Sequence, residues 1–247
     1  MRRLKASIPV LVMATLLTSG CAGSRNSPAA AAGDLPPPSA SPLDPRIQLA
    51  GLVAAAKDRR FSAGYTFTPP GQAPRTVTVE LAADGSWRVE VPGGALGGQA
   101  TVALVGNATG LYQCRVSGAS PSCVKAADPD GTLPPSADPR VQHPLVDWLD
   151  PLTDRTSALS VTVAPAPAGA RGTCFSVEAN TAALTAPVDP GVYCYDTDGT
   201  LTAVKAGFGS LVLASTPAPA PATVALPGPV TAGAPLPTAA AGAGSTP

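Results

Sequence analysis

Two spacings of hydrophobic residues divide the middle of the chain into predicted helices and strands. Between residues 44 and 60 the apolar positions recur every three or four residues, as on one face of an α-helix. Asp44 is a candidate N-cap, and Pro45 suits the first helical position. The apolar stripe consists of Ile47, Leu49, Leu52, Val53 and Ala56. These features predict a helix over residues 44–60.

From residue 61 onward the hydrophobic period changes to two, which predicts strands with one buried face. The alternating segments are 61–68, 76–81, 87–91, 99–105, 110–114, 123–125, 157–163, 173–178, 191–197, 200–205 and 210–214. Asp84-Gly85 and Asp198-Gly199 each separate two such segments, a strong hairpin signal. Because hairpins recur without regular βαβ alternation, we predict an α+β fold on an antiparallel sheet of about ten to eleven strands.

Two segments between the predicted strands have a different character. Residues 140–149 are predicted to form a short helix interrupted by Pro144, with its apolar side chains facing the core or a cleft. The glycine-rich run 93–98 lacks the Lys and Ser/Thr of a phosphate-binding loop. We interpret that run as a flexible connection between strands.

The first twenty residues have the pattern of an export signal. Basic side chains in residues 2–5 precede the apolar run 8–17, which is shorter than the roughly 20 residues needed to cross a bilayer. A run of this length is typical of the h-region of a cleaved signal. The signal is therefore predicted to comprise residues 1–20.

The residues that end this signal resemble a bacterial lipobox. They are Leu17-Thr18-Ser19-Gly20-Cys21, with Thr18 where the family usually has Leu. The resemblance implies cleavage before Cys21 and a diacylglyceryl group on that cysteine, a stable membrane anchor. We therefore expect a lipoprotein on the extracytoplasmic face of the cell membrane. An ordinary secretory signal with an incidental cysteine is the alternative.

Segments of biased composition flank the predicted domain. Residues 21–43 contain three consecutive prolines and an alanine run, which predicts a flexible tether. Residues 217–247 are rich in Ala, Pro, Gly and Thr and carry no charge, so this tail is predicted to be disordered, above all beyond about Val230. A single folded domain is expected between them, over residues 44–216.

The charge balance argues against a polyanionic partner. The chain has 16 Lys and Arg residues and 16 Asp and Glu residues. Loss of residues 1–20 removes three basic side chains and no acidic one, leaving 13 against 16 and a formal net charge of −3. No cluster of Lys or Arg remains, so nucleic acid is not an expected partner.

After lipidation of Cys21 four cysteines remain, an even number that indicates two disulfides in an exported domain. Three pairings are possible. We favour the local one, Cys114–Cys123 and Cys174–Cys194, because each pair lies within one predicted hairpin or two adjacent strands. Metal binding is the competing interpretation, but there is no C-x-x-C spacing and the one histidine has no partner at ligand spacing. No metal or other cofactor is expected.

Candidate catalytic residues are scarce. The one histidine, His143, directly precedes Pro144, and no nucleophile-elbow sequence occurs in the chain. We therefore expect no catalytic residues and no enzymatic activity. The alternative is a hydrolase or other enzyme with clustered polar residues in a cleft, for which His143, Asp147 and Asp150 would be the residues to replace.

The order of these features resembles the LolA-like superfamily and, within it, the LppX/LprG type of lipoprotein. The local patterns that carry the resemblance are RFSAGYT (60–66), DGSWRVE (84–90), CFSV (174–177) and GVYCYD (191–196). The resemblance covers about residues 44–215 and implies a half-barrel, a curved antiparallel sheet wrapped around helices with an apolar cavity for acyl chains. The two predicted disulfides are not general to that superfamily. No catalytic motif and no ligand-binding residue carries over.

Two functions remain open from the sequence. The first is a membrane-anchored lipoprotein that binds or carries a lipid or other apolar ligand in the cell envelope, which requires a cavity. The alternative is an envelope lipoprotein that binds a protein partner without lipid cargo, which requires an exposed apolar patch.

Overall fold

The computed structural model describes residues 43–129, 131–180 and 186–239. The chain divides into two units, residues 1–41 and 42–247, and all described residues belong to the second. The predicted signal (1–20), nearly all of the predicted tether (21–43) and the predicted lipidation site Cys21 therefore lie outside the described residues.

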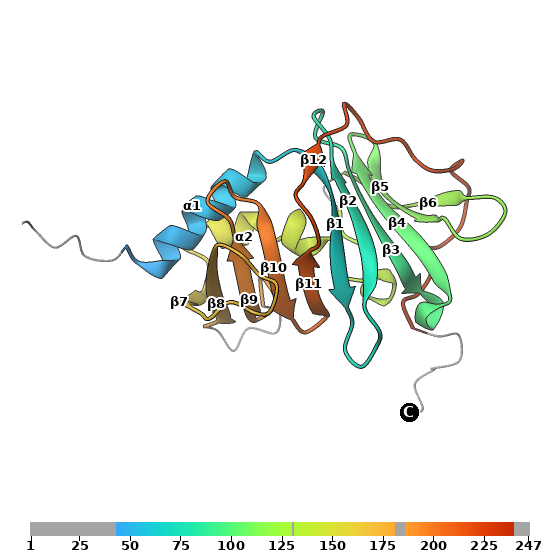
Figure 1. The fold of residues 1–247 in the computed structure, drawn as a ribbon. Helices are drawn as coiled ribbons and strands as arrows, with labels where there is room; N and C mark the ends of the chain where they lie inside the picture. The colour runs from blue at the N-terminus through green and yellow to red at the C-terminus, as the bar shows by residue number, and fades with distance from the viewer. Residues whose placement is uncertain (1–42, 130, 181–185, 240–247) are drawn as a thin grey trace, which may run out of the picture. The chain divides into compact units, whose positions relative to one another are not determined.

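The main element of the described chain is one antiparallel sheet of twelve strands (Figure 1). In chain order the strands are β1 (Phe61–Thr68), β2 (Arg75–Leu81), β3 (Trp87–Ala95), β4 (Ala100–Asn107), β5 (Gly110–Arg115), β6 (Ser122–Ala127), β7 (Leu159–Val163), β8 (Thr173–Ala179), β9 (Gly191–Tyr195), β10 (Leu201–Ala206), β11 (Gly209–Leu213) and β12 (Ala218–Pro219). The α+β class and the antiparallel sheet predicted from the hydrophobic spacing are confirmed.

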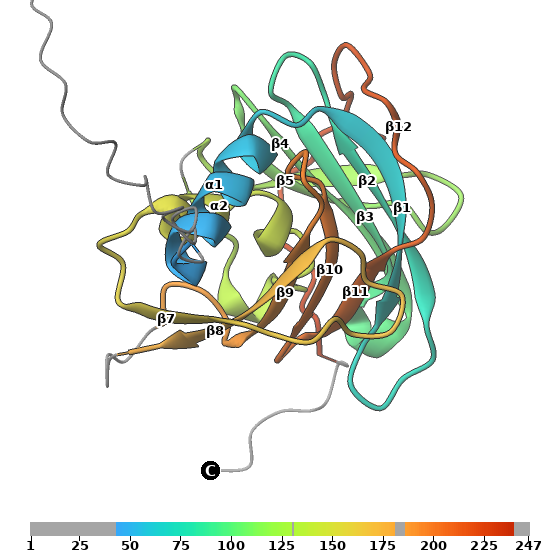
Figure 2. The ribbon, with the colours of Figure 1, turned by 60° about the vertical axis from the view of Figure 1, so that its left-hand side comes forward.

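The sheet is open, with spatial order β6-β5-β4-β3-β2-β1-β11-β10-β9-β8-β7. Strand β1 pairs with β11, with Tyr65 opposite Leu213, and this pairing joins the N-terminal and C-terminal halves of the sheet. The twelfth strand, β12, lies off this path and pairs with β1. Figure 2 shows the sheet bending around the two helices.

Helix α1 (Pro45–Lys57) begins as the sequence predicts. The Asp44 carboxylate accepts a hydrogen bond from the Arg46 backbone amide at 2.7 Å, and Pro45 occupies the first turn. Part of the predicted stripe turns inward, with Leu49 and Val53 fully buried and Ala56 buried, whereas Ile47 is exposed. Complete burial of each such side chain stabilises the fold by roughly 1.5–3 kcal/mol.

The helix predicted over residues 140–149 is wrong. This stretch forms a 3₁₀ turn, η3 (His143–Leu145), and the short helix α2 (Leu149–Thr153) begins only where the prediction ends. Pro144 suits the first turn of a helix but not its interior. Val146 then leaves helical geometry, with φ −133° and ψ −75°. Two further 3₁₀ turns are η1 (Leu96–Gly98) and η2 (Pro135–Ala137).

One face of the sheet, here called the inner face, shares a hydrophobic core with the helices. In β1 the alternating residues Phe61, Ala63, Tyr65 and Phe67 are buried on this face. The core also contains Val53 of α1 and the following buried residues of the segment 141–152: Val141, Leu145, Trp148, Leu149 and Leu152. Side chains of these two segments therefore occupy much of the space over the inner face.

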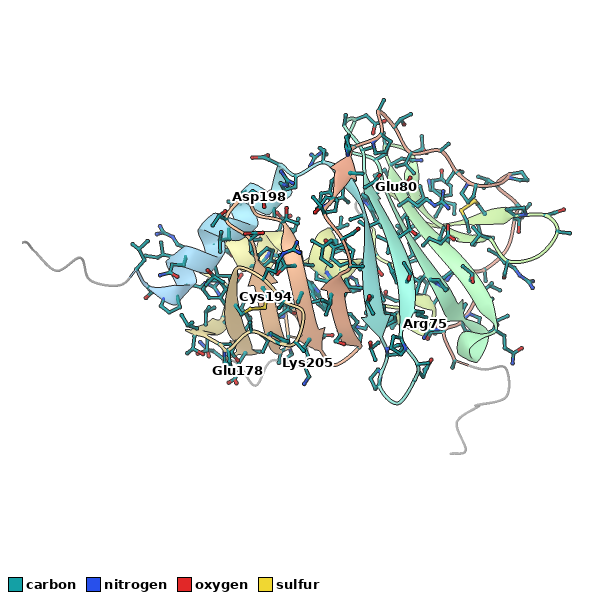
Figure 3. The ribbon with its side chains drawn as sticks, viewed as in Figure 1. Arg75, Glu80, Glu178, Cys194, Asp198 and Lys205 are labelled. Atoms are coloured by element: carbon teal, nitrogen blue, oxygen red, sulfur yellow. A yellow bond between two sulfur atoms is a disulfide. The ribbon has the colours of Figure 1, made fainter. Side chains whose placement is uncertain are left out.

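The opposite, outer face of the sheet carries both disulfides, one in each half. Cys114 and Cys123 are cross-strand partners in β5 and β6, with Cα atoms 3.9 Å apart. Cys174 and Cys194 are partners in β8 and β9, with Cα atoms 4.0 Å apart (Figure 3). The predicted local pairing is confirmed.

Residues 216–239 are ordered along the sheet, so the prediction of a disordered tail from residue 217 is wrong over this stretch. The Cys123 backbone amide donates to the Pro229 carbonyl at 2.9 Å, and the Thr231 amide donates to the Cys123 carbonyl at 2.8 Å. Leu236 and the buried Gln113 side chain exchange two hydrogen bonds. The folded region thus extends past the predicted boundary at 216, while residues 240–247 lie outside the described residues.

This C-terminal strap, residues 216–239, covers part of the outer face. Val224 packs with Ala103, Val105, Tyr112 and the first disulfide in a second hydrophobic cluster. As a result β4 and β5 are buried on both faces. The sequence of the strap has no hydrophobic period of its own. The strap is held instead by its contacts with the sheet.

No helix in the described residues is both long and apolar enough to cross a membrane.

Candidate functional site

A pocket of about 200 Å³ opens where three distant segments meet: the end of α1, the β2–β3 hairpin and residues 145–150. Its walls are mainly apolar. They are formed by Ala56, Leu81, Ala82, Trp87, Leu145, Val146 and Leu149, and its edge by Lys57, Arg59, Arg60, Gly85, Ser86 and Asp150. We call this the Trp87 pocket.

Trp87, the first residue of β3, is partly buried and packs against the core of the inner face. It pairs across the sheet with Gly106 of β4. A Cβ atom at Gly106 would lie 2.3 Å from the Trp87 indole nitrogen. Glycine at position 106 therefore lets the indole ring lie directly on the neighbouring strand and form a wall of the pocket.

The hairpin beside Trp87 is held by short polar contacts. Gly85 adopts φ 86°, a left-handed conformation that favours glycine. The Ser86 hydroxyl donates to the Asp84 carboxylate at 2.6 Å and accepts from the Val224 amide at 2.9 Å. These contacts tie the edge of the pocket to the C-terminal strap.

Three basic residues lie at the edge of the Trp87 pocket. Lys57 pairs with Asp150 at 2.5 Å, and Arg59 pairs with Asp198 at 3.1 Å. Arg60 donates to the backbone carbonyls of residues 57 and 59, and among the described residues no carboxylate lies within ion-pair distance of it. The edge therefore carries an exposed positive charge that is not compensated locally.

A second, larger cavity of about 530 Å³ lies on the other side of Trp87. It shares Gly85, Ser86, Trp87 and Val146 with the Trp87 pocket and has a mixed polar and apolar lining. The two spaces are therefore neighbours that share part of their walls.

His143 lies between two carboxylates and is partly buried. Its Nε2 is 2.6 Å from an Asp138 oxygen, and its Nδ1 is 2.5 Å from an Asp147 oxygen. The imidazole stacks on Trp148, with ring centroids 5.2 Å apart. Burial alone would lower the pKa of His143, but the two carboxylates outweigh it and raise the pKa to about 9.

This arrangement does not resemble a catalytic base. Both imidazole nitrogens are engaged by carboxylates, and the raised pKa keeps the ring protonated at neutral pH. From the sequence, Asp150 is named with His143 and Asp147 as candidate residues of an enzyme. In the structure Asp150 pairs with Lys57 instead. The structure therefore brings His143 and Asp147 together, but not Asp150 with them.

The sequence did not identify the residues that surround this cluster. Asp138 accepts hydrogen bonds from His143 and Gln142, and these lower its pKa although burial opposes them. Arg140 pairs with Asp189, whose carboxylate is mostly buried, and burial raises the pKa of Asp189. Asp138, Arg140 and Gln142 lie within five residues of His143, whereas Asp189 is distant in the sequence and no local pattern connects it to them.

Within the described residues, no group of three or more His, Cys, Asp or Glu side chains is placed to hold a metal ion. All four cysteines of the described domain are joined in disulfides.

The Trp87 pocket was not predicted either, because its walls come from residues 56–60, 81–87 and 145–150, which only the fold brings together.

Comparison of the sequence with models of known protein families and with curated proteins finds no match.

Proposed function

We propose that this chain is a lipoprotein of the bacterial cell envelope, anchored through Cys21, whose folded domain binds an apolar ligand. The export signal and the lipobox support the anchor. The observation that carries the binding function is the Trp87 pocket, an apolar hollow of about 200 Å³ with basic residues at its edge.

The bent sheet with helices on its inner face supports a half-barrel of the LolA-like, LppX/LprG type (Figure 2). In such a fold an apolar ligand would lie between the sheet and the helices. The Trp87 pocket occupies one end of that space, so a ligand entering there would contact both layers.

The size of the pocket limits the ligand. Pockets that bury drug-sized molecules measure roughly 300–1,000 Å³, and the Trp87 pocket is smaller. Core side chains already fill the space behind it. The ligand that fits best is therefore one acyl chain or a similarly slender apolar group. An anionic head would lie beside Arg60, where positive charge is uncompensated.

The small volume also favours a second candidate, an envelope protein partner that inserts one apolar side chain into the same pocket. In that case the pocket would be a docking point, and no lipid would be carried.

The binding function is tested by filling the pocket. In the full chain carrying Cys21→Ala and Trp148→Phe, Trp87 is the sole tryptophan, and titration with straight-chain fatty acids should shift its emission. Ala56 is buried and lines the pocket, so Ala56→Leu should abolish the shift. Ala54 is exposed on the same helix, and Ala54→Leu is the matched control.

Equal responses of the Ala56→Leu and Ala54→Leu variants would show that acyl chains do not enter the Trp87 pocket. Native mass spectrometry of the chain purified from its host should show a bound species of defined mass. The protein-partner function would be favoured by two results together: the purified chain carries no lipid but retains a stable envelope protein, and the Ala56→Leu variant loses that protein.

The anchor is tested separately. Cys21→Ala in the full chain should abolish incorporation of a labelled fatty acid and release the protein from the membrane fraction. Ser19→Ala keeps a small residue before the cysteine and should leave both unchanged. Labelling of the Cys21→Ala variant would contradict the anchor.

A further inference from the structure

A third cavity, of about 310 Å³, lies at the other end of the inner face from the Trp87 pocket. The two ends are separated by the length of β1, roughly 20 Å at about 3.3 Å per residue. The walls of this cavity come from the β1–β2 turn, the glycine-rich run 93–98, residues 138–140 and the β10–β11 turn. We call it the Arg75 pocket, and nothing in the proposed function uses it.

Arg75, the first residue of β2, is a partly buried cation on the wall of this pocket (Figure 3). Its Nη1 donates to the Gly93 carbonyl at 3.2 Å, and its Nη2 donates to the Gln72 side chain at 2.9 Å. Its Nε is buried without a hydrogen-bond partner. Since a guanidinium has five N–H donors, Arg75 retains unused donors beside the cavity.

The other charged residues of the pocket each have a partner of opposite charge. Arg140 pairs with Asp189, and Asp138 pairs with the protonated His143. Arg75 has only neutral hydrogen-bond partners, and within the described residues no carboxylate comes within ion-pair distance of it. The Arg75 pocket therefore carries one uncompensated positive charge, at the guanidinium.

The glycine-rich run makes room for this guanidinium. A Cβ atom at Gly93 would lie 2.3 Å from Arg75 Nη1, and Gly93 adopts φ 60°. Any larger residue at position 93 would push the guanidinium away from the strand. From the sequence, the run 93–98 is interpreted as a flexible connection. In the structure its first residue, Gly93, leaves the space that the Arg75 guanidinium occupies.

Aromatic and proline side chains complete the pocket. The Arg75 guanidinium lies 5.5 Å from the centroid of the Phe67 ring. Phe67 in turn packs against Phe208, with ring centroids 6.1 Å apart, and Pro69 and Pro70 line the same cavity. An apolar group could therefore lie against the rings while an anionic group reaches the guanidinium.

We propose that the Arg75 pocket binds a small organic carboxylate, with its carboxylate on the guanidinium of Arg75 and its apolar part against Phe67 and Phe208. The planar fork of an arginine matches a carboxylate with two parallel hydrogen bonds. The volume lies at the lower end of the range for small-molecule sites. The ligand is therefore a compact molecule, not a lipid.

Trp148 reports on this pocket because its ring centroid lies 6.0 Å from that of Phe208. In the full chain carrying Cys21→Ala and Trp87→Phe, Trp148 is the sole tryptophan. Titration with phenylacetate should change its emission in a saturable way. Phenylacetamide, which has the same shape without charge, should give no saturable change. Added salt should weaken the binding.

Arg75→Gln should weaken phenylacetate binding by about tenfold or more. Arg88→Gln removes the same charge from a residue that pairs with Glu90 elsewhere on the sheet, and it should leave binding unchanged. Ala56→Leu should also leave it unchanged, because Ala56 belongs to the Trp87 pocket. If circular dichroism shows that Arg75→Gln is unfolded, Arg75→Lys takes its place, since it keeps the charge but loses the fork and should still weaken binding.

Several results would overturn the proposal. They are the absence of a saturable response to phenylacetate, full binding in a folded Arg75 variant, and equal binding of phenylacetamide. Inorganic phosphate that binds as tightly as phenylacetate would also overturn it, because the apolar part would then contribute nothing. Loss of phenylacetate binding in the Ala56→Leu variant would assign the signal to the Trp87 pocket instead.

Discussion

At the scale of single residues, the most unusual environment in the described chain is that of His143. Its imidazole lies between Asp138 and Asp147 and stacks on Trp148. An ion pair of this kind is held in place by its hydrogen bonds, and removal of one partner would leave a carboxylate partly buried without compensation. The cluster therefore holds the segment that forms one wall of the Trp87 pocket.

The protonation of His143 should be visible in Trp148 fluorescence. A protonated imidazole quenches a stacked indole, so emission of the Trp87→Phe variant should rise as pH passes through about 9. Because the folded pKa exceeds the unfolded value near 6.5, the stabilisation from His143 is complete below about pH 6.5 and is lost as pH rises through about 9. His143→Gln should abolish the fluorescence transition. A transition near pH 6.5 would contradict the carboxylate contacts.

At the scale of elements, hydrophobic spacing predicted strands better than it predicted segments ordered by long-range contacts. Each of the eleven strands of the main path overlaps a predicted alternating segment, although β3 continues to Ala95, into the run predicted to be a connection, and α1 begins at the predicted cap. The short helix α2 and the strap were missed or misplaced. Their order depends on the inner core and on the sheet, respectively, and not on a period of their own.

The strap should stabilise the sheet. Deletion of residues 217–247 would expose the cluster around Val224 and free the backbone of Cys123 in the edge strand β6. We expect the free energy of unfolding to fall by about 2 kcal/mol or more, which is the contribution of one buried apolar side chain. Urea unfolding measures it, with deletion of residues 240–247 as the control. Equal stability of the two truncated chains would show that the strap adds nothing.

The two disulfides should stabilise the domain to different extents. Cys174–Cys194 closes a longer loop than Cys114–Cys123, with sequence separations of 20 and 9. In the chain-entropy model each contributes about 3 kcal/mol, and the longer loop contributes about 0.7 kcal/mol more. Replacing each pair with alanine and measuring urea unfolding tests this order. A larger loss from the shorter loop would mean that native packing decides the effect.

At the scale of the whole molecule, the two halves of the sheet are joined through β1 and β11, and one buried contact reinforces the junction. The Tyr65 hydroxyl donates to the Leu201 carbonyl of β10 at 2.9 Å. Burial raises the pKa of Tyr65, so the hydroxyl stays protonated and able to donate. The inner core is also continuous across both halves. The domain should therefore unfold as one unit.

Tyr65→Phe removes only the buried hydroxyl and leaves the Leu201 carbonyl unpaired. We expect the free energy of unfolding to fall by about 1–2 kcal/mol, because a buried carbonyl that has lost its donor still carries the free-energy cost of its removal from water. Urea unfolding followed by tryptophan emission and by circular dichroism should give one coincident transition for both proteins. Two separate transitions in the variant would show that the halves unfold independently.

The sequence alone determined features that depend on local chemistry. The cap at Asp44, the alternation in β1 and the Asp-Gly hairpins follow from backbone preferences and from a period that each segment carries itself. The same local proximity made the disulfide pairing predictable. The proposed export signal and lipobox rest on local patterns as well.

Only the tertiary structure decided where the two pockets lie. The Trp87 pocket needs Gly106 under the indole ring, and the Arg75 pocket needs Gly93 beside the guanidinium. The path of the C-terminal strap likewise depends on hydrogen bonds to β6 and to Gln113. Each of these contacts joins residues far apart in the chain, and a period or motif within one segment carries no information about which distant segment will lie against it.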